Sequence, residues 1–181
     1  MDDDGQPPIR RLKTTEQKNL QEAIKSNDFT HFKKLIEEHY PCEDALIKVC
    51  KFGNDAKFIR LLVEEFDFDI NYQDSVGLTG LHHACGLGNT EFVSILLDQN
   101  NIDQDLFDKK GCTPLMCAVT SEQIETVAEC LTHGCNPLLE NGEQMCAMRI
   151  AINLPHIEKS LVIKVLIEDA IHSWVQNLGA D

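Results

Sequence analysis

The amino-acid sequence predicts an all-α fold, an α-solenoid in which helix–turn–helix repeats with hairpin loops stack in a line. The first observation is a self-match: Gly, Thr, Leu and Ala in residues 77–84 recur at the same offsets in residues 111–118, 34 positions later. The second is a helical spacing of apolar residues around each of these segments. A self-match at this period is typical of stacked repeat arrays.

Each recurring position has a physical role in a pair of helices. Gly77 and Gly111 follow a polar turn, where glycine can adopt a positive φ without a steric penalty. Thr79 and Thr113 stand where a helix begins, so each is expected to cap that helix. The Ala of each copy lies three residues after a Leu on one helical face, and its small size lets the next helix pair come close.

These segments resemble the ankyrin repeat, whose core reads Gly-x-Thr-Pro-Leu-His-x-Ala. One copy matches at Gly77, Thr79, Leu81, His82 and Ala84. The other matches at Gly111, Thr113, Pro114, Leu115 and Ala118, with Met116 in place of His. The resemblance implies an ankyrin-type array of about five repeats over residues 14–172, two of them clear and three degenerate.

The two repeats before the clear ones are expected at residues 14–42 and 43–73. In the first, helical spacing runs from Thr14 to His39, and a break at 26–28 separates two helices. In the second, Leu46 and Val49 stand 35 positions before Leu81 and Ala84. Its exit, 69–71, reads Asp-Ile-Asn as in ankyrin repeats, and residues 72–77 are expected to form the hairpin into the third repeat.

The clear repeats are expected at 74–107 and 108–140, and a weaker fifth one at 141–172. The exit of the third repeat, 100–104, holds two more residues than the exit before it, so that turn should bulge. In the fourth, Gly134 fits the left-handed position that follows a helix. Its core is expected to be Ile124, Val127, Leu131 and Leu138.

In the fifth repeat Cys146 replaces the capping Thr, and Pro155 separates the two helices. The last inward apolar face is expected to be Leu161, Val162, Val165 and Leu166, with Ile171, Trp174 and Val175 extending it. The flanks are assigned to a disordered polar segment at 1–13 and a C-terminal extension at 173–181.

The composition limits the class of partner and the cellular compartment that can be expected. Acidic residues outnumber basic ones by 30 to 16, which argues against nucleic acid and suits either solubility or a basic protein partner. No signal peptide and no apolar run long enough for a bilayer is seen, so no membrane association is expected. The eight Cys residues are then expected to be reduced thiols in the cytoplasm, the nucleus or both.

Two clusters could carry chemistry, and each also has a structural interpretation. His82, Cys85, Cys112 and Cys117 would be the donors of a metal site, but the resemblance gives His82 a bond to its own turn. Cys130 and His133 are helical neighbours that could pair as a thiol nucleophile and its base, but no pocket is indicated. We therefore expect no enzyme activity, no cofactor, no metal and no small-molecule substrate.

The function expected is protein binding through the concave face formed by the first helices and the hairpin tips. Contact positions of the ankyrin family, carried onto the third repeat, are Ser75, Val76, Leu78, His83 and Leu87. On the fourth repeat they are Lys109, Lys110, Cys112, Thr120 and Ser121. Val76, Leu78 and Leu87 are apolar where packing does not require it, which favours an interface.

Three readings of this function remain open. The chain is an adaptor, scaffold or inhibitor that docks a signalling protein or a transcription factor, or it is a structural recognition subunit or domain of a larger assembly. The third is an enzyme that uses the Cys and His residues. A modification site is also expected at Asn71, because Asp69-Ile70-Asn71 resembles targets of asparagine hydroxylation in this family, although Val63 replaces the usual upstream Leu.

Overall fold

The structure is a computed structural model, and it describes residues 14–39, 44–66 and 68–178. These residues form ten helices and no strands. The helices are α1 (Thr14–Lys25), α2 (Phe29–His39), α3 (Ala45–Phe52), α4 (Ala56–Glu65), α5 (Gly80–Leu87), α6 (Thr90–Leu97), α7 (Pro114–Thr120), α8 (Ile124–Thr132), α9 (Ala147–Ile152) and α10 (Ile157–Leu178). The all-α prediction is confirmed.

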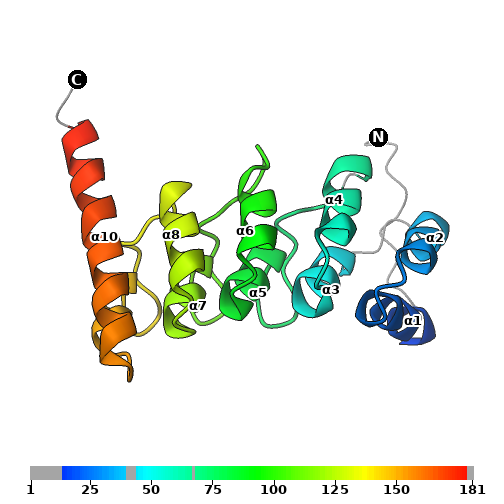
Figure 1. The fold of residues 1–181 in the computed structure, drawn as a ribbon, viewed down its shortest axis with the longest axis horizontal. Coiled ribbons are helices and arrows are strands. Elements are labelled where there is room, and N and C mark those ends of the chain that lie inside the picture. The colour runs from blue at the N-terminus through cyan, green and yellow to red at the C-terminus, as the bar shows by residue number, and fades with distance from the viewer. Residues whose placement is uncertain (1–13, 40–43, 67, 179–181) are drawn as a thin grey trace, which may run out of the picture.

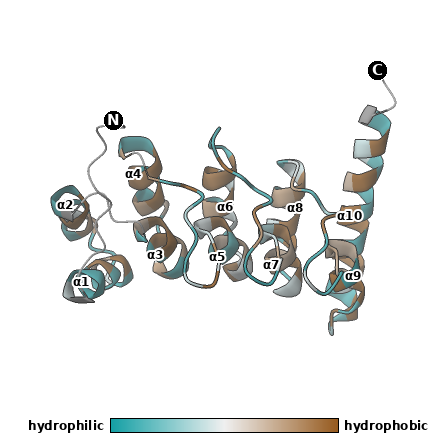
Figure 2. Cartoon of the chain, turned by 180° about the vertical axis from the view of Figure 1, so that it is seen from behind, coloured by the Kyte–Doolittle hydropathy of each residue, from teal (hydrophilic) through white to brown (hydrophobic). Residues whose placement is uncertain are grey.

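The helices pair in chain order and the pairs stack in a single row, with α1 and α2 at one end and α10 at the other (Figure 1). First helices contact first helices along α1, α3, α5, α7 and α9, and second helices do the same from α2 to α10. Loops between successive pairs repeat along one side of the array (Figure 2). The loop after α6 projects beyond the end of that helix, where the longer exit was expected to bulge (Figure 1).

Local sequence explains where the helices begin and end. The hydroxyls of Thr79 and Thr113 accept hydrogen bonds from the backbone N–H groups of His82 and Met116, so both predicted caps are confirmed. The carboxylate of Asp28 accepts the N–H of His31 at 3.0 Å and so caps α2. Gly134, two residues after α8, has a φ of +82°, as expected for a residue that ends a helix in the left-handed region.

The core lies between the helix layers and runs the length of the row. Ala84 and Ala118 are fully buried in α5 and α7, as predicted. The rings of Phe32 and Phe58 meet edge to face with centroids 4.9 Å apart and join the first two repeats. One continuous cluster of buried apolar residues thus links all five pairs.

Two predictions about the core were wrong. Leu138 is 55% exposed, because the exit turn after α8 buries Pro137 and leaves the next side chain in solvent. In α10, Leu161, Val162, Val165 and Val175 are exposed, and the fully buried residues are Ile163 and Ile167.

The flanks of the array are described only in part. The predicted segment 1–13 and the residues 179–181 lie outside the described residues, as do 40–43 and 67. The second helix of the fifth repeat does not end at residue 172 but continues to Leu178. None of the helices in the described ranges combines the length and the apolar character that crossing a membrane would need.

Candidate functional site

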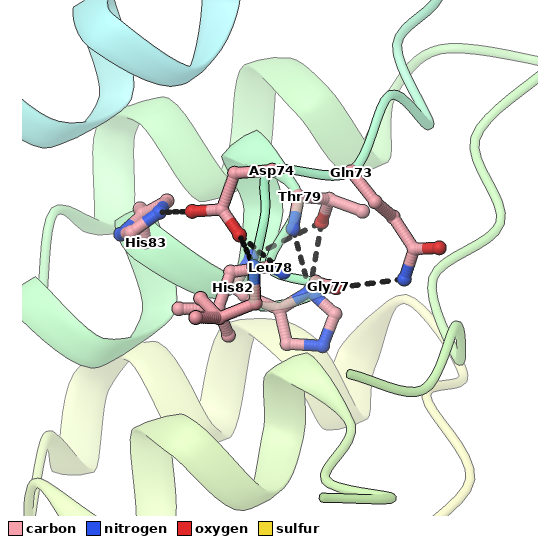
Figure 3. Close-up of polar contacts among 8 residues, drawn as sticks. Gln73, Asp74, Gly77, Leu78, Thr79, His82 and His83 are labelled. Carbon is pink, nitrogen blue, oxygen red and sulfur yellow. Dashed lines mark hydrogen bonds and ion pairs between the residues drawn. The ribbon is translucent and has the colours of Figure 1, made fainter. Parts of the chain in front are cut away.

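The hairpin tip before α5 is organised by one carboxylate. Oδ1 of Asp74 accepts the backbone N–H groups of Val76 at 2.9 Å and Leu78 at 3.0 Å, and Nε2 of His83 donates to Oδ2 at 3.1 Å (Figure 3). Burial opposes ionisation, but these three hydrogen bonds outweigh it and lower the pKa of Asp74. Gly77, with a φ of +86°, closes the turn.

The next two tips repeat this arrangement. Oδ1 of Asp108 accepts the N–H groups of Lys110 and Cys112, both at 2.8 Å. Oδ1 of Asn141 accepts the N–H groups of Glu143 at 2.9 Å and Met145 at 3.0 Å. These three residues were not among the predicted site residues. The signal was available, because Asp or Asn stands three positions before the residue with positive φ in each tip.

Successive tips are joined to one another by backbone hydrogen bonds. The N–H of Lys109 donates to the carbonyl of Val76 at 3.2 Å, and the N–H of Gly142 donates to the carbonyl of Lys110 at 3.0 Å. The ammonium of Lys109 also reaches the carbonyl of Ser75 at 2.7 Å. The tips therefore form a continuous edge with fixed positions, on which a partner could dock without first ordering loops.

The predicted contact residues of the third repeat differ in exposure. Ser75 is exposed, Val76 is 53% exposed and Leu87 is 58% exposed. Leu78 is only half exposed, so packing uses part of it. His83 is also half-buried, and its bond to Asp74 gives it a structural role in the tip.

In the fourth repeat, four of the five predicted contact residues are exposed: Lys109, Lys110, Thr120 and Ser121. Cys112 is half-buried, and its thiol is 3.7 Å from the amide nitrogen of Asn141. Burial raises the pKa of the Cys112 thiol, which keeps it protonated and weakly nucleophilic.

The candidate metal donors are occupied by structural contacts. Nδ1 of His82 lies 3.1 Å from the backbone nitrogen of Thr79 and 2.8 Å from its hydroxyl (Figure 3). Its Nε2 lies 3.1 Å from the carbonyl of Cys112. Burial lowers the pKa of His82, so the ring is held neutral between these groups. Nowhere in the described ranges do three His, Cys, Asp or Glu side chains converge as a metal site would require.

The candidate thiol pair is not assembled. Cys130 is fully buried, with its sulfur 3.5 Å from that of Cys85, and its pKa is raised. His133 instead bonds the carbonyl of Glu129 at 3.0 Å and the carboxylate of Asp98 at 3.4 Å. Desolvation also raises the pKa of Cys117, to about 12. The geometry thus provides no activated thiolate at these positions.

Asn71 links two exit turns. Its side-chain nitrogen donates to the carbonyl of Asn101 at 2.8 Å, and its oxygen accepts the N–H of Asp103 at 2.8 Å. A modification that altered this side chain would therefore act on the contact between the second and third repeats. Hydroxylation of Asn71 itself stays a prediction.

A row of helix pairs with joined hairpin tips and an exposed edge defines a repeat protein that binds its partners on an extended surface. The family comparison gives the same class. The model of ankyrin repeats in three copies matches residues 46–141. The chain belongs to the ankyrin repeat family.

The chain is similar to part of several longer proteins. The human BCL-6 corepressor-like protein 1 is 29% identical over 120 residues, which are 66% of this chain and 7% of that protein. The human SMC5-SMC6 complex localization factor protein 1 is 31% identical over 134 residues, 73% of this chain and 12% of that protein. A human channel, transient receptor potential cation channel subfamily A member 1, is 36% identical over 89 residues, 49% of this chain and 8% of the channel.

The chain thus aligns with a small part of each of these much longer relatives. What it shares with them is the repeat array, and ankyrin arrays are protein–protein interaction modules that are generally not enzymes.

Proposed function

We propose that the chain is a non-enzymatic binding module whose concave face, across the third and fourth repeats, captures a protein partner as an adaptor, scaffold or inhibitor in the cytoplasm or the nucleus. The observation that carries the proposal is the pair Val76 and Leu87, both more than half exposed, at a hairpin tip and at the end of the adjacent helix. Exposed apolar side chains in a rigid setting with a polar rim are typical of specific interfaces.

The rim supports the same face. Lys109 and Lys110 are exposed on the next tip, and Thr120 and Ser121 are exposed at the end of α7. These residues supply a charged edge and hydrogen-bonding groups around the two apolar side chains. A typical interface buries about 800 Å² on each partner, which requires roughly two or three repeats.

The relatives favour a second candidate function, recognition within a larger assembly. One relative is by name a corepressor-like protein and another a localization factor of a complex. Under this alternative the same face docks a stable component of an assembly rather than a transient signalling partner. The residues involved are the same, so one set of variants tests the surface in both cases.

The test is partner capture with Val76→Ser/Leu87→Ser. Both residues are exposed, so the variant should fold as the unmodified chain does, whereas substitution of the half-buried Leu78 could disturb packing. The partner is first identified by affinity purification and mass spectrometry, then purified, and its affinity is measured by calorimetry. We expect the affinity to fall at least about tenfold, because a few central residues dominate most interfaces.

The matched control is Leu138→Ser, which removes a leucine of similar exposure outside the predicted face. It should bind as tightly as the unmodified chain. If the double variant is folded and retains full affinity for the partner, the concave face is not the binding surface.

A further inference from the structure

The most apolar exposed surface of the described residues lies at the C-terminal end of the row, away from the predicted concave face. It consists of Ile152 on α9 and Ile157, Leu161, Val162 and Val165 on α10, each between 45% and 74% exposed. We call these five residues the end face. No described residue covers them.

Inside the array, the equivalents of Ile157 and Ile152 face the next second helix. Thr90, Ile124 and Ile157 are the first residues of α6, α8 and α10. The hydroxyl of Thr90 lies 2.9 Å from that of Thr126 on α8, so this position faces the next second helix. Asp98, two turns further on at the position of Val165, contacts His133 beyond α8 at 3.4 Å.

The position of Ile152 follows the same rule. Its equivalent in the third repeat is Cys85, whose sulfur meets that of Cys130 on α8 at 3.5 Å. The end face therefore has the same orientation as the surface of the third repeat that receives α8. By this geometry its natural occupant is another α-helix lying alongside α10.

The side chains on the end face are the opposite of what a solvated cap requires. Terminal repeats keep an array soluble by presenting a polar outer face. In the third repeat two of these positions are the half-buried Thr90 and the exposed Asp98, but on α10 they are the exposed apolar residues Ile157 and Val165. The residues become more apolar where the row ends, which indicates a surface that is covered in use.

The charges around the end face identify the partner's chemistry. At about 100° per residue, the arc of α10 from Ile157 round to Val162 also carries the exposed carboxylates of Glu158, Glu168 and Asp169. Lys159 points away from this arc, toward Glu122, at 3.6 Å. No Lys or Arg among the described residues of α10 lies within the arc, and the partly buried Lys164 lies at its edge, so the apolar residues share the arc with three carboxylates.

A second copy of the chain fits this surface poorly. An antiparallel pair of α10 helices centred between Leu161 and Val165 would set Glu158 of each copy opposite Glu168 of the other. A parallel pair would set each carboxylate opposite the same residue of the other copy. Both arrangements place like charges together in a desolvated contact, which opposes association.

We infer that the end face is a second docking surface, which binds an amphipathic α-helix of a protein partner with an apolar stripe flanked by Lys and Arg. The surface is separate from the concave face of the third and fourth repeats, so both could be occupied at once. The inference does not depend on what binds the concave face.

The probes are two synthetic helical peptides with the same leucine stripe, one flanked by Lys and the other by Glu, and binding to the full chain is read by fluorescence anisotropy. We expect the Lys peptide to bind at least about tenfold more tightly than the Glu peptide. Leu161→Ser/Val165→Ser keeps every charge and should weaken the Lys peptide by about tenfold or more. Val76→Ser/Leu87→Ser, on the concave face, should leave it unchanged.

A second variant tests the charges alone. Glu168→Lys/Asp169→Lys should reverse the preference and bind the Glu peptide better, and circular dichroism checks that each variant keeps its helix content. Equal binding of both peptides would show that the carboxylates do not select the partner, and undiminished binding of the Lys peptide to Leu161→Ser/Val165→Ser would show non-specific attraction to an acidic protein. Either result would overturn the inference. Self-association that this double variant abolishes, measured by sedimentation, would also overturn it, since a second copy would then be the occupant.

Discussion

Thr79 and Thr113 cap their helices through their hydroxyls, whereas Cys146, which stands before α9 at the same position, makes no such bond. The third and fourth repeats thus keep a cap that the fifth repeat lacks. The first helices of these repeats therefore differ in the source of their stability. A missing cap costs about 0.5–2 kcal/mol, and α9 must obtain that stability from its packing against α7 and α10.

The hairpin tips show a second difference with a clear cause. Gly77 and Gly111 have positive φ angles, and a Cβ on either would lie 2.7 Å from a backbone nitrogen of the following tip. In the fifth repeat the corresponding residue is Gln144, also with a positive φ of 58°. No described tip follows it, so there is room for a side chain. Glycine is therefore required where the next repeat closes over the tip, and only preferred where none does.

The first prediction concerns the closest approach between central helices. Ala118→Leu should lower the free energy of unfolding by about 1–3 kcal/mol, because α7 is packed against both α5 and α9 and the added methyl groups have no space. Thr132→Leu, at an exposed position of α8, is the control and should change stability by less than about 0.5 kcal/mol. Urea titration measures both. An unchanged midpoint for Ala118→Leu would mean that the repeats are wrongly aligned.

The second prediction sets a central tip against the last one. Gly111→Ala should cost about 1–2 kcal/mol for the left-handed backbone, plus the displacement of the Gly142 backbone. Gln144→Gly should instead stabilise the chain, by about 0.5–1 kcal/mol, since relief of the backbone strain is partly offset by the greater freedom of glycine in the unfolded chain.

Thermal or urea unfolding of the two variants beside the unmodified chain gives both signs in one experiment. If Gln144→Gly destabilises as much as Gly111→Ala does, the side chain of Gln144 makes contacts that outweigh the strain.

The fold could be predicted from the sequence at positions where the structure requires one particular residue type. Gly at the tip, Thr at the helix start and Ala at the close contact recur because each position is enclosed by a neighbour, and all were found where predicted. It was not sufficient for α10. Residues 161–167 read Leu-Val-Ile-Lys-Val-Leu-Ile, apolar on almost every side, so helical period cannot distinguish Ile163 and Ile167 from the outward Leu161 and Val165.

The candidate site was predictable in outline only. Exposure of Val76 and Leu87 follows from their place outside the packing positions of the repeat. The half-burial of Leu78 and His83 does not, because it depends on the three-dimensional turn that Asp74 holds together. Likewise, the choice of Pro137 over Leu138 for burial is set by the path of the exit turn rather than by hydrophobicity. Which residues touch a partner stays a prediction.

The smallest effect is expected from a change in the side chain that accepts the hydrogen bonds of a hairpin tip. Asn141 receives the same two backbone hydrogen bonds as Asp74 but carries no charge, so Asp74→Asn should keep the turn and lose only the charged contact with His83. At neutral pH the loss should be below about 1 kcal/mol, as for other partly exposed pairs. The structure of the tip should be unchanged.

The lowered pKa of Asp74 also predicts how the stability difference between the unmodified chain and Asp74→Asn changes with pH. The folded-state pKa of Asp74 is lowered, so its contribution to stability is complete above the unfolded value, about 3.9, and is lost as the pH falls through the folded value. Asn cannot titrate, so the unfolding free energy of the unmodified chain should exceed that of Asp74→Asn at pH 7 and lose that advantage near the acid limit of folding. Urea unfolding at a series of pH values measures the difference. A difference that stays constant across this acid range would show that the ionised carboxylate contributes nothing beyond what the neutral amide of Asn141 supplies in the last tip.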